Sequence, residues 1–131
     1  MHSKDVRKVA EKLIDYFIEN SDADTLFQIF RGLRKFSKDT PILSEITIRC
    51  LRSSADLKNI SAMLSLGWRL LDGEGLDKNP IDGKLLLESA ALSGDADAMM
   101  ILANRLLDGK GLDQNIEEGR LSVLHESVKQ G

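Results

Sequence analysis

Apolar positions recur every three to four residues through most of the chain, and this spacing predicts helices rather than strands. Within residues 61–72, for example, Ala62, Leu66 and Leu70 fall on one face of a helix. The same periodicity predicts seven helices, at residues 4–19, 24–36, 41–53, 57–72, 80–93, 96–108 and 116–129. The first of them carries an apolar face formed by Val6, Val9, Leu13 and Phe17. The pattern therefore predicts an all-α fold.

The helical pattern is itself repeated with a period of 36 residues. Residues 61–79 and 97–115 are identical at 12 of 19 positions, and both contain the sequence Leu-Leu-Asp-Gly-x-Gly-Leu-Asp-x-Asn. A period of this length is typical of a solenoid of two-helix units. Mid-helix positions Gly67 and Ala103 carry little side chain, which predicts close approach by a neighbouring helix.

The repeated ten-residue phrase is interpreted as the joint between the two helices of a unit. Gly73 and Gly109 stand where a helix ends with a positive φ, which glycine adopts without steric cost. Asn79 is a suitable N-cap before Pro80, the first residue of the next helix. In the second copy the same role is predicted for the capping-box-like pair Asn115 and Glu118.

The first half of the chain contains a more divergent copy. Ser-Asp-Ala-Asp at 21–24 corresponds to Gly-Asp-Ala-Asp at 94–97, and the glycine joint is replaced by a shorter segment that ends in Thr40 and Pro41. We therefore expect one α-solenoid domain over 1–131. Its parts are an N-terminal helix or half repeat (1–20), a degenerate repeat (21–60), a full repeat (61–96) and a terminal or truncated repeat (97–131).

These residues resemble the Sel1-like repeat, a relative of the tetratricopeptide repeat. The family's small residue, Leu-Gly, Gly-x-Gly, Ala-Ala and final Gly are matched by Ala62, Leu66, Gly67, Gly73, Gly75, Ala90, Ala91 and Gly94. The resemblance covers residues 61–125, and the last helix departs from it at Glu126, Ser127 and Gln130. It implies a right-handed α-solenoid of antiparallel helix pairs, and adaptor or scaffold work rather than catalysis.

Charge and composition exclude several classes of function. The net charge is −3, with 11 Lys/Arg and 9 Asp/Glu in residues 1–60 (+2) against 7 and 12 in residues 61–131 (−5). Nucleic-acid binding is not expected, since it requires a strongly basic surface. No apolar run approaches the length of a membrane span, and no export signal is visible. With Cys50 as the one cysteine, the expected location is the reducing cytoplasm.

Candidate catalytic and metal-binding groups are few. His2 and His125 have no nucleophile and carboxylate spaced around them, and Cys50 is expected to be a buried, inert thiol on an apolar helix face. The Gly-x-Gly joints lack the alternating acids of a calcium-binding loop. We therefore predict no catalytic residue, no metal and no cofactor.

Stacking the first helices of the units in register places large side chains in columns beside the core stripe. One column holds Phe27, Leu64 and Met100, and the next holds Arg31, Trp68 and Asn104, with Arg69 and Arg105 adjacent to it. First helices line the concave surface of such solenoids, so these residues form a candidate binding surface for a protein or peptide. The alternative is that Phe27, Leu64, Met100 and Trp68 pack within the fold.

A second candidate feature is a basic run. Arg31, Arg34, Lys35 and Lys38 would share one face of the second predicted helix. They could receive an acidic peptide, a phosphate group or anionic lipid headgroups, or they form an ordinary solvated face.

The sequence thus favours a protein-interaction module, an adaptor or scaffold. Three alternatives stay open: an accessory domain of a larger protein, such as a bacterial surface-polysaccharide or envelope protein; a self-assembly module; and, less favoured, an enzyme.

Overall fold

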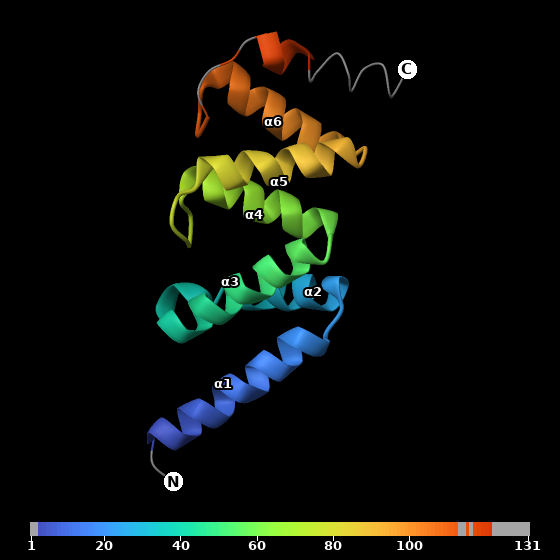
Figure 1. Ribbon diagram of the computed structural model, residues 1–131. Coiled ribbons are helices and arrows are strands. Elements are labelled where there is room, and N and C mark those ends of the chain that lie inside the picture. The colour runs from blue at the N-terminus through green and yellow to red at the C-terminus, as the bar shows by residue number, and fades with distance from the viewer. Residues whose placement is uncertain (1–2, 113–114, 116, 122–131) are drawn as a thin grey trace. The chain divides into compact units, whose positions relative to one another are not determined.

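The computed structural model describes residues 3–112, 115 and 117–121, and within them it is helical with no strand (Figure 1). The helices are α1 (Ser3–Asn20), α2 (Ala23–Leu33), the 3₁₀ helix η1 (Ser37–Asp39), α3 (Pro41–Asp56), α4 (Ile60–Asp72), α5 (Pro80–Leu92) and α6 (Ala96–Asp108). Residues 117–121 are also helical, and the rest of the predicted helix at 116–129 lies outside the described residues. The prediction of an all-α fold is confirmed.

The chain divides into two compact units, Met1–Asn59 (unit 1) and Ile60–Gly131 (unit 2). The boundary falls within one residue of the predicted start of the full repeat at 61. Whether the chain behaves as one domain stays a prediction.

Unit 1 is organised around the antiparallel pair α2 and α3 (Figure 1). Its core is formed by side chains that are almost completely buried, among them Leu26, Phe30, Cys50, Leu51 and Ala55. Asp22 caps α2, since its Oδ1 accepts a hydrogen bond of 2.7 Å from the Thr25 backbone N–H. Asp95 caps α6 in the same way, which confirms the predicted correspondence between residues 21–24 and 94–97.

Helix α1 packs on α3, and the side of α1 that is used differs from its predicted apolar face. Ile18 is buried, and Asp15 pairs with Arg49 of α3. Val9, Leu13 and Phe17, by contrast, are exposed. The side chain of Val6 lies outside the described residues.

Three predicted helix ends in unit 1 and at its boundary were wrong. The second helix ends at Leu33 instead of 36, because tighter i→i+3 bonds from Phe36 N to Leu33 O (3.0 Å) and Ser37 N to Arg34 O (3.4 Å) replace the α-helical pattern. Helix α3 runs on to Asp56 instead of 53, and Lys58 (φ 72°) then turns the chain, so α4 begins at Ile60 instead of 57.

Unit 2 contains the antiparallel pair α4 and α5, followed by α6 (Figure 1). The helix axes of α4 and α5 approach closely at two glycines: a Cβ on Gly83 would lie 2.8 Å from the Gly67 carbonyl oxygen. This confirms the predicted close approach at Gly67. Leu71, Leu87, Leu102 and Leu106 form the core cluster that joins α4, α5 and α6.

The two joints of unit 2 close in the same manner. Gly73 and Gly109 have φ values of 71° and 68°, as predicted. The Asn79 backbone N–H donates to the Leu70 carbonyl at 2.8 Å, and the Asn115 N–H donates to Leu106 at the same distance. Leu112 folds back onto the core cluster. The phrase is repeated because each copy encodes the same hydrogen-bonded turn.

Replacing Gly109 with alanine is expected to lower the free energy of unfolding by about 1–2 kcal/mol, because a Cβ is strained at φ 68°. Gly109→Asn is the matched control, since asparagine tolerates the left-handed region better and should lose less. Urea melts followed by circular dichroism measure both. An alanine variant as stable as the wild type would contradict this explanation of the joint.

Candidate functional site

The first helices of the two repeats in unit 2 carry a candidate binding surface. We call it the α4–α6 surface; it consists of Leu64, Trp68 and Arg69 on α4 and Met100 and Asn104 on α6. Trp68 is half-buried, so part of its ring reaches solvent. The Arg69 guanidinium carbon lies 4.5 Å from the centre of the indole, a cation–π contact, and Arg69 Nε donates to Ser65 Oγ at 3.3 Å. These contacts hold the indole and the guanidinium in a defined arrangement.

The other members of the surface differ in exposure. Leu64 is half-buried and packs against the core cluster of unit 2, so packing accounts for much of its role. Met100 is 42% exposed, and Asn104 is exposed. The candidate surface therefore includes two accessible side chains on α6 and the partly accessible Trp68 on α4.

Arg105, also predicted to contact a partner, has a partner within the chain. Its Nη1 and Nη2 donate to the two carboxylate oxygens of Asp72 at 2.6 and 2.9 Å. The hydrogen bond from Arg105 lowers the pKa of Asp72 despite partial desolvation, and the same bond raises the pKa of Arg105. This two-pronged pair ties the end of α4 to α6, so the guanidinium is engaged within unit 2 and has a structural role.

The predicted basic run lies in unit 1 and does not occupy one helix face. Only Arg31 belongs to α2; Arg34 is its C-cap, Lys35 lies in the following turn, and Lys38 lies in η1. The prediction of a shared helix face was wrong because α2 ends at Leu33. All four side chains are nevertheless exposed within eight consecutive residues. We call residues 31–38 the basic segment.

Aromatic rings accompany the basic segment. Phe27 is half-buried, and its ring centre lies 5.7 Å from that of Phe30, which belongs to the core. Phe36 is exposed, and Lys35 Nζ lies 5.2 Å from the centre of its ring. Phe27 thus contributes mainly to packing, while Phe36 is accessible beside the four cations.

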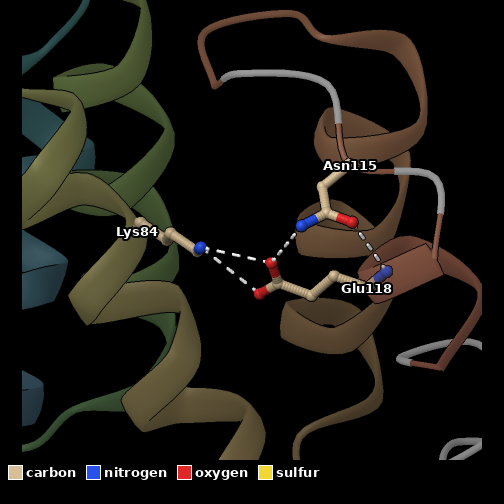
Figure 2. Close-up of polar contacts among 3 residues, drawn as sticks. All are labelled: Lys84, Asn115 and Glu118. Carbon is tan, nitrogen blue, oxygen red and sulfur yellow. Dashed lines mark hydrogen bonds and ion pairs between the residues drawn. The ribbon is translucent and has the colours of Figure 1, made fainter.

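A groove that the sequence did not predict lies between the two joints of unit 2. It has a volume of about 630 Å³, and its lining includes the apolar residues Pro80, Ile81, Leu106 and Leu112. Figure 2 shows its polar side: Lys84 Nζ lies 3.3 and 3.4 Å from the Glu118 carboxylate oxygens, and Asn115 Nδ2 donates to Glu118 at 3.3 Å.

The same polar cluster caps the helix at 117–121, since the Glu118 backbone N–H donates to Asn115 Oδ1 at 3.0 Å. Asn115 therefore acts as the predicted cap. The contact from Lys84, 34 residues earlier, is one that the sequence pattern could not reveal. It links α5 to the helix at 117–121, so we assign this cluster a structural role.

Candidate catalytic groups are placed as follows. Cys50 is buried, as predicted, and burial raises the pKa of its thiol, which disfavours the reactive thiolate. His2 and His125 lie outside the described residues. Among the residues that the structure describes, no group of three or more His, Cys, Asp or Glu is placed to hold a metal ion. None of the described helices combines the length and apolar character that a membrane span requires.

The packed helix pairs, the repeated joints and the side-chain links between repeats define a helical repeat protein of the α-solenoid class. The chain is similar in structure to the Sel1 repeat protein from Oxalobacter formigenes, with a TM-score of 0.77 and 22% sequence identity. The match covers 92% of this chain and 35% of that protein, so the chain spans about a third of its length. This similarity confirms the predicted Sel1-like repeat fold.

Comparisons by sequence identified no relative of this chain. A scan against protein-family profiles gave no match, and a search of curated proteins gave none either. The fold is therefore established by structure and by the repeated joints.

Proposed function

We propose that this chain is a protein-interaction module that binds an extended segment of a partner protein across the α4–α6 surface. The observation that carries the proposal is Trp68: a half-buried indole in contact with Arg69, on a helix of a pair that approaches closely at Gly67 and Gly83. Tryptophan and arginine are the side chains most often found as anchors of interfaces.

The neighbouring side chains support the same role. Met100 adds an adaptable apolar contact, and Asn104 adds a donor and an acceptor that can bond to a peptide backbone. Leu64 supplies an apolar floor that is continuous with the core. An extended chain laid across α4 and α6 would meet all three, in the concave-surface mode of a repeat array.

The proposal includes no catalysis by this chain. A nucleophile must be accessible and activated, and the Cys50 thiol is buried with a raised pKa. The Gly-x-Gly joints, which might suggest a ligand loop, are occupied in closing turns onto Leu70 and Leu106.

The proposal is tested by selecting binders from a displayed random-peptide library and mapping a synthetic binder on the ¹⁵N-labelled chain. We expect amide shifts concentrated on α4 and α6, together with a change in the fluorescence of the single tryptophan. Shifts confined to unit 1, or a library that yields no binder, would contradict the proposal.

For the basic segment we propose an acidic partner sequence, because Arg31, Arg34, Lys35 and Lys38 lie exposed within eight residues of chain. A peptide rich in Asp and Glu is expected to bind about threefold or more weakly when salt rises from about 50 to 150 mM, since exposed charges are screened over about 8–10 Å.

Reversing the charge at one position distinguishes binding at the basic segment from a general effect of charge. Lys38→Glu should weaken binding of the acidic peptide, whereas Arg52→Glu, an exposed cation on α3 outside the basic segment, should not. Fluorescence anisotropy of a labelled peptide measures both. Equal effects of the two reversals, or binding that does not depend on salt, would show that the basic segment is an ordinary solvated surface.

A further inference from the structure

The basic segment holds an exposed aromatic ring among its cations. Phe36 is 55% exposed, whereas Phe30 in the same unit is buried and Phe27 is half-buried. Lys35 Nζ lies 5.2 Å from the centre of the Phe36 ring, so the ring is accessible directly beside a positive charge. A partner that carried only negative charge would leave this ring in water. The segment therefore offers an apolar contact in addition to its charges.

The four cations of the basic segment are available to a partner. None of them forms an ion pair with a residue that the structure describes, whereas Arg49 and Arg105 elsewhere in the chain do. Residues 31–40 contain four cations and one acid, Asp39, which gives a local charge of +3. This positive charge is complementary to a partner's carboxylates.

The backbone around Phe36 is held by hydrogen bonds. The Phe36 N–H donates to the Leu33 carbonyl at 3.0 Å, and the Ser37 hydroxyl donates to the Arg34 carbonyl at 2.8 Å. A Cβ on Gly32 would meet no atom within 4 Å, so the space beside this glycine is open. Because the turn is already ordered, little conformational entropy is lost when a partner contacts it.

We propose that the acidic sequence bound by the basic segment carries an aromatic side chain, which packs on the Phe36 ring while its carboxylates bind the surrounding cations. This inference rests on the proposed acidic partner and adds a contact that determines specificity. Arg31 and Arg34 can each bind a carboxylate through two parallel N–H bonds. Two aromatic rings gain more than their buried area alone provides, because they pack offset or edge to face.

An exposed acid in the same segment favours a peptide over an anionic lipid surface. Asp39 follows Lys38 directly and is exposed. A peptide can place its carboxylates at the cations and away from Asp39, whereas a lipid surface of negative headgroups would also face this carboxylate. Like charges at that distance disfavour the contact.

The proposal is tested with two labelled synthetic peptides of equal length and equal Asp and Glu content, which differ only in a central phenylalanine or alanine. By fluorescence anisotropy, the wild-type chain should bind the phenylalanine peptide about three- to tenfold more tightly, as expected for one aromatic pair. Phe36→Ala should bind the two peptides about equally, with its affinity for the alanine peptide unchanged.

Two matched variants serve as controls. Leu57→Ala removes a side chain of similar exposure (54%) outside the basic segment and should keep the preference for the phenylalanine peptide. Lys38→Glu should weaken both peptides by the same factor and so keep the preference as well. Because Phe36 is largely exposed, Phe36→Ala should stay folded, and circular dichroism checks this.

The outcomes distinguish this inference from the proposal on which it rests. Equal, salt-dependent binding of the two peptides by the wild type would overturn the aromatic contact and leave the acidic partner standing, whereas binding of neither peptide would overturn both. A preference that persists in Phe36→Ala would place the aromatic contact elsewhere. Vesicles of phosphatidylserine and phosphatidylcholine test the lipid alternative: vesicle binding that requires Phe36, without discrimination between the peptides, would also overturn the inference.

Discussion

Replacing Gly83 with alanine is expected to lower the free energy of unfolding of the chain by up to about 3 kcal/mol, because the added methyl group has no space. Its Cβ would lie 2.8 Å from the backbone oxygen of Gly67 and 3.1 Å from two side-chain carbons of Leu71. The backbone oxygen cannot rotate away, so α4 and α5 would have to separate. That movement would loosen the core cluster in which Leu71 and Leu87 pack.

Gly32→Ala is the matched control, because a Cβ on Gly32 in α2 meets nothing within 4 Å. Alanine is favoured over glycine in a helix by up to about 1 kcal/mol, so this variant should be as stable as the wild type or more so. Thermal and urea unfolding of the two variants give the comparison. A Gly83→Ala variant that gains stability as Gly32→Ala does would show that the helix pair can move apart without cost.

Trp68→Ala is expected to weaken peptide binding by more than about 2 kcal/mol, roughly 30-fold in Kd, if the indole anchors the partner. The same change should cost about 1 kcal/mol of folding stability, because Trp68 is half-buried and does not belong to the fully buried core. A core tryptophan would behave in the opposite way and lose about 3–5 kcal/mol of stability on truncation.

Two further variants distinguish the contribution of the indole ring to affinity from that of other apolar side chains. Trp68→Phe keeps an aromatic surface and should retain much of the affinity, and Leu57→Ala, at an exposed apolar position in unit 1, should retain all of it. Because Trp68 is the single tryptophan, its fluorescence and its quenching by iodide report directly on this site. An indole inaccessible to iodide, with unchanged affinity in Trp68→Ala, would show that the residue serves packing alone.

Much of the fold of unit 2 was predictable, because its information is local and occurs twice. Asn79 before Pro80 predicts a helix start, and Gly73 and Gly109 predict helix ends with positive φ; the structure has all of these features. Prediction was poorer in unit 1, where no glycine joint marks the end of α2. There the i→i+3 bonds from Phe36 and Ser37, which lead into the 3₁₀ helix η1, ended the helix three residues before the predicted position.

The candidate site was only partly predictable, because a helical period places side chains on a face but does not show which neighbours they contact. Periodicity placed Trp68 beside the core stripe, but it could not show that Arg69 stacks on the indole or that Arg105 is held by Asp72. The first contact depends on the side-chain rotamers of two neighbours on α4, and the second depends on side-chain directions across α4 and α6. The contact between Lys84 and Glu118, which joins helices 34 residues apart, is of the same kind.

The sequence by itself determined that the chain is helical, approximately where its helices lie, where the two joints of unit 2 turn, and that residues 61–79 recur 36 residues later. These features depend on the conformational preferences of single residues and on periodicities of three to four positions. Only the tertiary structure decided which apolar faces are covered. Val9, Leu13 and Phe17 have the pattern of a core stripe yet lie largely exposed, because α1 meets α3 mainly through Asp15 and the buried Ile18. A helical period shows that a face exists; which neighbour covers it depends on contacts between residues far apart in the chain.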